Sequence, residues 1–459
     1  MIDTLKKALS GDYHHDFTEG SLKQAILLLA IPMVLELSME SLFAIVDVFW
    51  VARLGSDAVT IVGLTESMLA ILYAVAMGLC AGAGAFVARR IGEKDAEGAA
   101  AAAGQSILLT IALSVVVGLV AGHYAKDLLA LMTPETRIAD LGASYAKITF
   151  GASYAVLFLF VINAIFRGAG DAAIAMRVLW IANAVNLVLD PCLIFGWGPF
   201  PALGVEGSAV ATATGRTVGV GYQLWCLTRP GGRFQLHWRH MRPEPELLRG
   251  IWKVSFPGMF QYFVATASWV ALARIVAQFG SVATAGYTIA IRIIVMTIMP
   301  SWGLGGAAAT LVGQNLGAGK PDRSERATWL CGFYNMVFLG LVSVVFIAYA
   351  EPLIRIFSQE EAVVNVGKEA LRLISYGYLL YAYGMVLVQA FNGAGDTVTP
   401  TVINVLCYWL FQIPLAYWLA HGLGYGPSGV FWAVTIAECI IALAGIVMFR
   451  RGSWKQVKV

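Results

Sequence analysis

Long apolar segments fill this 459-residue chain, with short polar connections between them. A helix needs about 20 apolar residues to cross a bilayer, and these segments reach that length. The pattern predicts twelve membrane-spanning helices, at residues 22–52, 57–83, 99–123, 140–167, 174–198, 205–228, 247–279, 283–313, 325–350, 364–392, 398–421 and 427–450. Pro32 falls inside the first predicted span, where we expect a helix kink.

The second half of the chain repeats the first at one constant offset, which is the separation of Pro32 from Pro257 in the sequence. The same offset relates Gly55 to Gly280, Gly78 to Gly303, Gly92 to Gly317, and the glycines and aspartate of FRGAGD (166–171) to those of FNGAGD (391–396). Each half therefore holds six spans in the same order and orientation. The predicted fold is an all-α integral membrane protein of two six-helix lobes, related by a parallel internal repeat with its axis along the membrane normal.

Polar segments divide the chain into five predicted parts. These are an N-terminal arm (1–21), an N-terminal lobe (22–228), a linker (229–246), a C-terminal lobe (247–450) and a tail (451–459). Lysine and arginine gather in the connections on one side, together with the linker and the tail. By the positive-inside rule both termini are cytoplasmic. The arm lacks the apolar core of a signal peptide, so we expect a multi-pass protein of the inner cell membrane.

Composition excludes several classes of protein. Only 13% of the residues are charged and 59% are hydrophobic, whereas soluble domains carry roughly 25% charged residues. The six cysteines stand singly, as small buried hydrophobic residues do. The GAGD turns have no strand before them and no GK[ST] after them, so they are not phosphate loops. We expect no enzyme activity, no cofactor and no nucleic-acid partner.

The first predicted span carries three carboxylates on one face. Steps of four and seven residues place Glu36, Glu40 and Asp47 within about 60° of one another. A carboxylate in hydrocarbon costs about 2.5–3.5 kcal/mol on insertion scales, so this face must look into protein or a water-filled cavity. The equivalent positions of the second half are Gln261, Ala265 and Leu272. Because the second copy of the scaffold forms without the acids, they indicate function.

Further polar residues fall in neighbouring spans. Asp190 follows Asn186 by one helical turn, and Asn163 and Thr212 add neutral oxygens. Such oxygens suit a hard cation, with Na⁺ bound by Asp47, Asn186, Asp190 and Thr212. They suit a proton equally, because clustered carboxylates share protons. Glu36 and Glu40 either extend this cation site towards one membrane face or pair with buried arginines. Glu438, in the last span, is a secondary candidate for handling substrate or protons.

Several segments together resemble the multidrug and toxic compound extrusion (MATE) family over nearly the whole chain. They are VDVFWVARLG (46–55), GLTESMLAILYAVAMGLCAGAGAFVARRIGEKD (63–95), NAIFRGAGD (163–171), NLVLDP (186–191), GVEGSAVAT (204–212), VGQNLGAGK (312–320) and FNGAGDTVTP (391–400). The resemblance implies a twelve-helix, two-lobe antiporter that exports organic cations and other amphipathic drugs, driven by H⁺ or Na⁺.

The resemblance also implies roles for individual residues. Asp47 falls on the aspartate of the first-helix VD motif and Asp190 on that of the fifth-helix LDP motif, as in the DinF-like branch. That branch has its coupling site in the N-terminal lobe, where it would take in Asn186 and Thr212, with Asn163 nearby. Its first helix is described as bending at the proline, here Pro32, when the aspartate is protonated. Phe43 stands where some relatives have a tyrosine, and the acids that the NorM-like branch has in its seventh and tenth helices are missing.

These observations predict a multidrug efflux antiporter that exports amphipathic organic compounds, with cations preferred, in exchange for H⁺ or Na⁺. The alternative within the superfamily is a flippase for lipid-linked sugars or other amphiphiles. A polytopic membrane enzyme and a channel are less compatible with the chain, which shows no catalytic cluster beyond the carboxylates and no ring of pore charges. The expected partners are small amphipathic substrates and membrane lipid, with the protein acting as a monomer.

Overall fold

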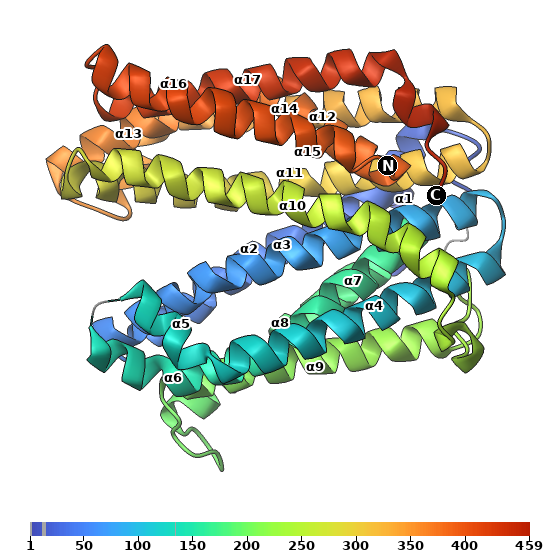
Figure 1. Cartoon of the computed structure of the whole chain (residues 1–459), viewed down its shortest axis with the longest axis horizontal. Coiled ribbons are helices and arrows are strands. Elements are labelled where there is room, and N and C mark those ends of the chain that lie inside the picture. The colour runs from blue at the N-terminus through green and yellow to red at the C-terminus, as the bar shows by residue number, and fades with distance from the viewer. Residues whose placement is uncertain (1, 12–14, 134) are drawn as a thin grey trace.

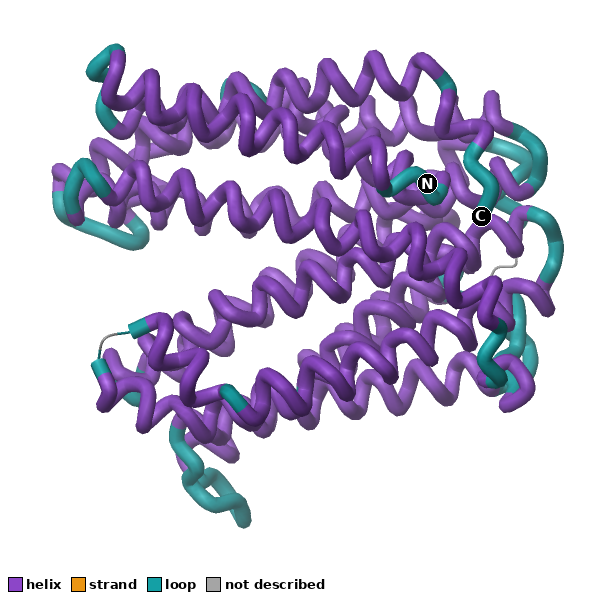
Figure 2. The backbone as a smooth tube through the Cα atoms, viewed as in Figure 1, coloured by secondary structure: helices purple, strands orange, loops and turns teal. Residues whose placement is uncertain are grey.

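The computed structural model describes residues 2–11, 15–133 and 135–459, and every regular element in these ranges is a helix (Figure 2). The first half contains α1 (Ile2–Ser10), α2 (Leu22–Ala52), α3 (Ser56–Gly92), α4 (Ala96–His123), α5 (Ala125–Met132), α6 (Thr136–Gly151), α7 (Ser153–Ala169), α8 (Ala172–Phe195) and α9 (Val205–Thr228). The second contains α10 (Pro245–Ala277), α11 (Ser281–Gly317), α12 (Pro321–Arg355), α13 (Glu361–Ser375), α14 (Tyr378–Ala394), α15 (Val398–Asn404), α16 (Ile413–Tyr417) and α17 (Pro427–Arg451). The predicted all-α class is confirmed.

All twelve predicted ranges are helical, but two of them are not single rods. The predicted span 140–167 is divided into α6 and α7 at Ala152, and 364–392 is divided into α13 and α14, which are bent by 62°. The two breaks fall at Ala152 and Gly377, which are equivalent in the repeat, and a glycine that weakens the helix lies at or next to each. Two π-helical segments, Val405–Gln412 and Trp418–Gly422, continue α15 and α16 into one span.

Ten spans in the described part of the chain are long and apolar enough to cross a membrane, and the bent α13–α14 pair makes an eleventh. The remaining predicted span is α9, which carries Glu206 and Arg216 among glycines and threonines and lies outside this set. Pro32 lies inside α2, which continues from Leu22 to Ala52, and the kink expected there stays a prediction.

The two halves of the chain form two lobes (Figure 1). The helices of the first half, blue to green, lie on one side of the molecule, and those of the second half, yellow to red, lie on the other. The lobes meet at the end that carries both termini and diverge towards the opposite end, where α10 and α2 lie far apart. We call the end with the termini the closed end.

Glycines let the backbones of the two lobes touch. On α3, a Cβ added at Gly78 would collide with the backbone nitrogen of Met259 on α10. On α11, a Cβ at Gly303 would lie 2.7 Å from the backbone nitrogen of Val34 on α2. The offset of the repeat relates Gly78 to Gly303 and Val34 to Met259. The same helix crossing therefore occurs twice. This explains why glycine is found at both positions.

A second repeated contact lies nearer the closed end, at the last turns of α3 and α11. Added side chains at Gly92 and Gly317 would collide with the carbonyl groups of Gln314 and Arg89, respectively. Gln314 and Arg89 are themselves equivalent, and each donates to the end of a helix in the other lobe. Gln314 Nε2 bonds to the carbonyl of Gly168 at 2.8 Å, and Arg89 Nη2 to that of Ala394 at 3.4 Å.

Gly78→Ala is expected to destabilise the protein by about 1–3 kcal/mol, because the added methyl group overpacks a backbone contact. Gly63→Ala is a control in the same helix, since nothing lies within 4 Å of its added Cβ, and it should gain about 0.5–1 kcal/mol in helix propensity. Thermal unfolding of the purified protein in detergent measures both. A melting temperature for Gly78→Ala at or above that of Gly63→Ala would contradict the close contact.

Candidate functional site

A cavity of about 500 Å³ lies between the lobes, with lining residues from α2, α3, α7 and α8 of the first half and α10, α11 and α14 of the second. Its apolar lining includes Met33, Met77, Phe160, Met299 and Trp302. Methionine and aromatic side chains adapt to ligands of different shapes. Glu36 and Glu40 also line the cavity, whereas Asp47, further along α2, is not among its lining residues.

Glu36 is held in an ion pair inside the N-terminal lobe. It is 3% exposed, and its Oε1 accepts from Arg167 Nη1 at 2.7 Å and from Asn163 Nδ2 at 2.9 Å. Gln223 in turn donates to Asn163 Oδ1 at 2.7 Å. Of the two alternatives left by the sequence, the structure therefore has Glu36 paired with a partly buried arginine. Asn163 bonds to this pair and lines the cavity, and its part in ion coupling stays a prediction.

Glu40, one turn further along α2, lies close to another arginine. Its Oε1 is 3.8 Å from Arg216 Nη2, and both side chains are mostly buried. Arg216 also donates to the hydroxyl of Tyr73 at 3.2 Å. Because Arg216 comes from α9 and Tyr73 from α3, this contact ties three helices of the N-terminal lobe together. Glu40, like Glu36, therefore lies beside an arginine, as the second of the two alternatives has it.

Asp47 differs from the other two acids of α2. It is 8% exposed, and its Oδ1 accepts from Ser208 Oγ on α9 at 3.0 Å. Among the described residues it forms no ion pair within 4.0 Å. Phe43, one turn before it, is half-buried. Ser208 is a site residue that was not predicted from the sequence, although it precedes Thr212 by one helical turn and so shares its face of α9.

Asp190 lies at the centre of a compact polar group on α8 and α9. It is fully buried, and Asn186 Nδ2 donates to its Oδ2 at 2.8 Å when the amide is oriented to satisfy both of its ends. In that orientation Asn186 Oδ1 accepts from the hydroxyl and the backbone nitrogen of Thr212, each at 3.0 Å. Asp47 lies within electrostatic range of Asp190. Ser208 and Thr212, one turn apart on α9, connect the two acids to one helix: Ser208 bonds to Asp47, and Thr212 bonds to Asn186, the partner of Asp190.

The chemistry of this group suits a small hard cation. The donors of Asp47, Asp190, Asn186 and Thr212 are all oxygens, which Na⁺ shares as preferred ligands with other hard cations. The described residues contain no group of three or more His, Cys, Asp or Glu side chains that could hold a metal ion. Carboxylates within electrostatic range of each other can also share a proton, so the same group suits H⁺ as well.

Two further charged groups lie outside this arrangement. Glu66 on α3, which the sequence analysis missed, is exposed and lies within electrostatic range of Asp47, Arg216 and Arg292. Its signal in the sequence is the TES triplet in the middle of an apolar span. Glu438 on α17 is buried in the C-terminal lobe, where Tyr408 Oη donates to it at 3.2 Å, and it is not among the residues that line the cavity.

Comparison with known proteins agrees with the fold and its repeat. The MatE family model matches the chain twice, at residues 32–192 and 257–418. The chain belongs to the MatE family. The two matches begin at Pro32 and Pro257, the pair that defines the offset of the repeat, which confirms the internal repeat. The family is one of membrane transporters, and the chain is accordingly a multi-pass membrane protein.

Relatives match along almost the whole chain. The "Probable multidrug resistance protein NorM" of Thermotoga maritima is 27% identical over 95% of this chain and 94% of its own length. The "Multidrug export protein MepA" of Staphylococcus aureus is 23% identical, with 94% of each chain covered. The solved structure titled "Outward-facing conformation of a multidrug resistance MATE family transporter of the MOP superfamily" has 26% identity and a TM-score of 0.89, over 96% of this chain and 98% of that one.

The repeat offers a test of the Glu36–Arg167 pair, because its equivalents in the C-terminal lobe are the neutral residues Gln261 and Asn392. Arg167→Asn alone leaves a buried carboxylate without its cation and should cost about 3 kcal/mol or more. The double variant Glu36→Gln/Arg167→Asn copies the neutral pair and should recover most of that loss.

A double-mutant cycle of thermal unfolding, with Glu36→Gln as the other single variant, measures the coupling. Purely additive effects of the two substitutions would show that the two side chains do not depend on each other.

Proposed function

We propose that the protein is a multidrug efflux antiporter that exports amphipathic organic compounds, with cations preferred, in exchange for H⁺ or Na⁺. The single observation that carries the proposal is the difference among the acids of α2. Glu36 has an arginine partner and Glu40 lies beside one, whereas Asp47 is held by the hydroxyl of Ser208 next to Asp190. Asp47 is therefore the acid of this helix whose charge is open to change, and it lies on the helix that faces the cavity.

The arrangement supports a mechanism of alternating access. Positive charges in the connections at the closed end favour a cytoplasmic location for both termini in the inner membrane, so the end where the lobes diverge faces outwards. An ion that enters from outside neutralises or occupies Asp47 and Asp190. The negative potential of these carboxylates in the cavity then weakens, which lowers the affinity for a bound cation. The substrate leaves to the outside, and the lobes rock to the other state.

The apolar lining supports a wide substrate range. Met33, Met77, Met299 and Trp302 offer flexible and planar surfaces from both lobes. A volume of about 500 Å³ falls within the usual range of small-molecule pockets, about 300–1,000 Å³. The names of the relatives from Thermotoga and Staphylococcus speak of multidrug resistance and multidrug export, which agrees with a wide substrate range.

Asp47→Asn should abolish gradient-driven export, with efflux reduced by at least about tenfold, because an amide neither takes up a proton nor balances a bound cation. The measurement is efflux of a fluorescent cationic dye from proteoliposomes under separately imposed H⁺ and Na⁺ gradients. The gradient that drives the wild-type protein identifies the coupling ion.

Asp57→Asn is the matched control, because Asp57 is a half-exposed acid in the first turn of α3, ion-paired with Arg137 at 2.7 Å, and it does not line the cavity. It should transport like the wild-type protein. Unchanged, gradient-driven export by Asp47→Asn would refute the coupling role. Movement of a lipid-linked sugar in place of any dye would favour the flippase alternative.

A further inference from the structure

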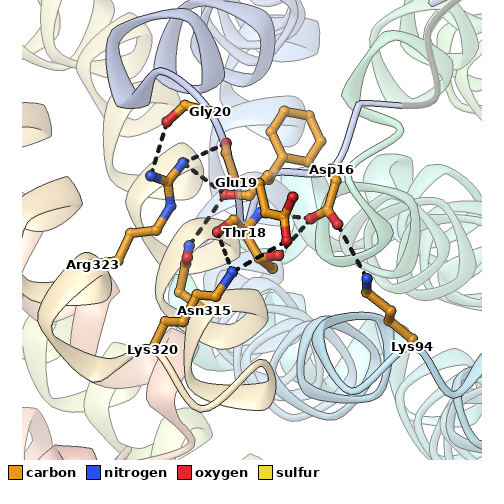
Figure 3. A network of polar contacts seen from close by, with 9 residues as sticks. Asp16, Thr18, Glu19, Gly20, Lys94, Asn315, Lys320 and Arg323 are labelled. Carbon is orange, nitrogen blue, oxygen red and sulfur yellow. Dashed lines mark hydrogen bonds and ion pairs between the residues drawn. The ribbon is translucent and has the colours of Figure 1, made fainter.

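Residues 15–20 are the last part of the N-terminal arm before α2, and we call them the strap. They lie at the closed end of the molecule (Figure 3). The segment is not helical, so its carbonyl groups lack the partners that a helix would give them. Phe17, in its middle, is fully buried. It packs in one cluster with alanines of α8 in the N-terminal lobe and of α11 and α12 in the C-terminal lobe. The strap thus lies where the two lobes meet.

One set of contacts holds the strap to the N-terminal lobe and the linker. Asp16 Oδ2 is 3.7 Å from Lys94 Nζ, and Arg233 Nη2 donates to the carbonyl of His15 at 2.9 Å. The guanidinium of Arg233 also lies over the Phe17 ring, 5.1 Å from its centroid. Gly170 makes room for this ring, because an added Cβ would stand 2.7 Å from it. Since the strap continues directly into α2, these contacts attach it to its own lobe.

A second set comes from the start of α12 and the end of α11 in the C-terminal lobe. Arg323 donates to the carbonyls of Gly20 at 3.0 Å, Glu19 at 2.7 Å and Phe17 at 3.4 Å. Lys320 Nζ donates to the carbonyl of Thr18 at 3.0 Å. Charged donors of the C-terminal lobe therefore bond to four consecutive carbonyl groups of the strap, which belongs to the N-terminal lobe. Charge-assisted hydrogen bonds of this kind are about twice as strong as neutral ones.

The same arrangement occurs a second time, in the other direction. The linker residues just before α10 are equivalent to the strap, since the offset of the repeat relates residues 15–20 to His240 and the residues up to Pro245. They dock on α4 of the N-terminal lobe, where Gln105 Nε2 donates to the carbonyls of His240 at 2.9 Å and Arg242 at 2.8 Å. Each lobe thus receives, near the start of its third long helix, the segment that precedes the first helix of the other lobe.

We propose that the strap is a latch that keeps the closed end closed, and that it leaves the C-terminal lobe and stays on the N-terminal lobe when that end opens. The proposal depends on the alternating access proposed above, because only lobes that separate at this end must release it. The bonds of Arg323 and Lys320 to the strap break on opening, and the contacts of Lys94 and Arg233 with the strap remain. Opening then requires the transfer of four strap carbonyls from cationic donors to water.

Two cross-links distinguish release from retention. In a background without the six native cysteines, Thr18→Cys with Lys320→Cys joins the strap to the C-terminal lobe, and Asp16→Cys with Lys94→Cys joins it to the N-terminal lobe. A cleavable bifunctional methanethiosulfonate about as long as a lysine side chain links each pair. The first link should stop dye efflux from proteoliposomes, and reduction should restore it. The second should leave at least about half of the efflux. Equal effects of the two links, or continued efflux with the first, would overturn the proposal.

A distance measurement tests the latch without any substrate. Spin labels at Ala96→Cys and Arg326→Cys, both exposed positions at the closed end of opposite lobes, report the separation of the lobes by double electron–electron resonance. Arg323→Ala should raise the fraction of molecules with the longer distance about tenfold. Arg450→Ala is the control, because this exposed arginine of the C-terminal lobe lies over Trp329 and touches no strap residue among those described.

An unchanged distance distribution in Arg323→Ala would overturn the latch. A protein that moved no dye in any form would contradict the proposed function, and the spin-label distances would still decide whether the strap holds the lobes together.

Discussion

Backbone contact between the two lobes is the constraint on which the rest of the structure depends. Side chains normally keep helix axes about 8–10 Å apart, and glycine removes that limit at the two crossings through Gly78 and Gly303. Backbone therefore lies against backbone at both crossings. Contacts of this kind have no interlocking side chains to block rotation of one lobe against the other. The cavity and the strap both lie where the lobes meet.

Both lobes have the same helical scaffold, but the acids of α2 have no charged equivalents in the C-terminal lobe. Glu36 and Arg167 correspond to Gln261 and Asn392, and Asp47 corresponds to Leu272. The C-terminal lobe packs the same helices with neutral amides and aliphatic side chains, so the acids of α2 are not needed for folding. In the proposed mechanism, an ion that binds beside Asp47 therefore changes the charge of one lobe only, and the charge of the other lobe stays the same.

Much of the architecture followed from two sequence signals, the lengths of the apolar segments and the constant offset between the two halves. The bounds of α2 and α9 agree with the predicted spans to the residue. The breaks in the spans 140–167 and 364–392 were not foreseen, because an apolar stretch has the same composition whether it is straight or bent. In the site, the sequence placed the acids on one face of α2, since that follows from helical geometry alone. The partners Arg167, Arg216 and Ser208 come from other helices, and their pairing depends on packing that periodicity does not encode.

In the proposed rocking motion, distance from the glycine crossing separates the contacts that survive rotation from those that break. From Gly78 to Gly92, α3 extends roughly 21 Å at the rise of an α-helix. A rotation of about 15°, typical of rigid-body transitions, moves the crossing itself hardly at all and the end of α3 by about 5 Å. Hydrogen bonds do not extend beyond about 3.5 Å, so the bonds of Arg89, Gln314 and Arg323 at this end must all break together. The apolar contact at Gly78 and Gly303 needs no particular donor geometry and tolerates the same rotation. Directional polar bonds at the rim and a glycine contact at the pivot are therefore what a two-state rocking protein requires, because the first make each end state distinct and the second keeps the lobes joined in both.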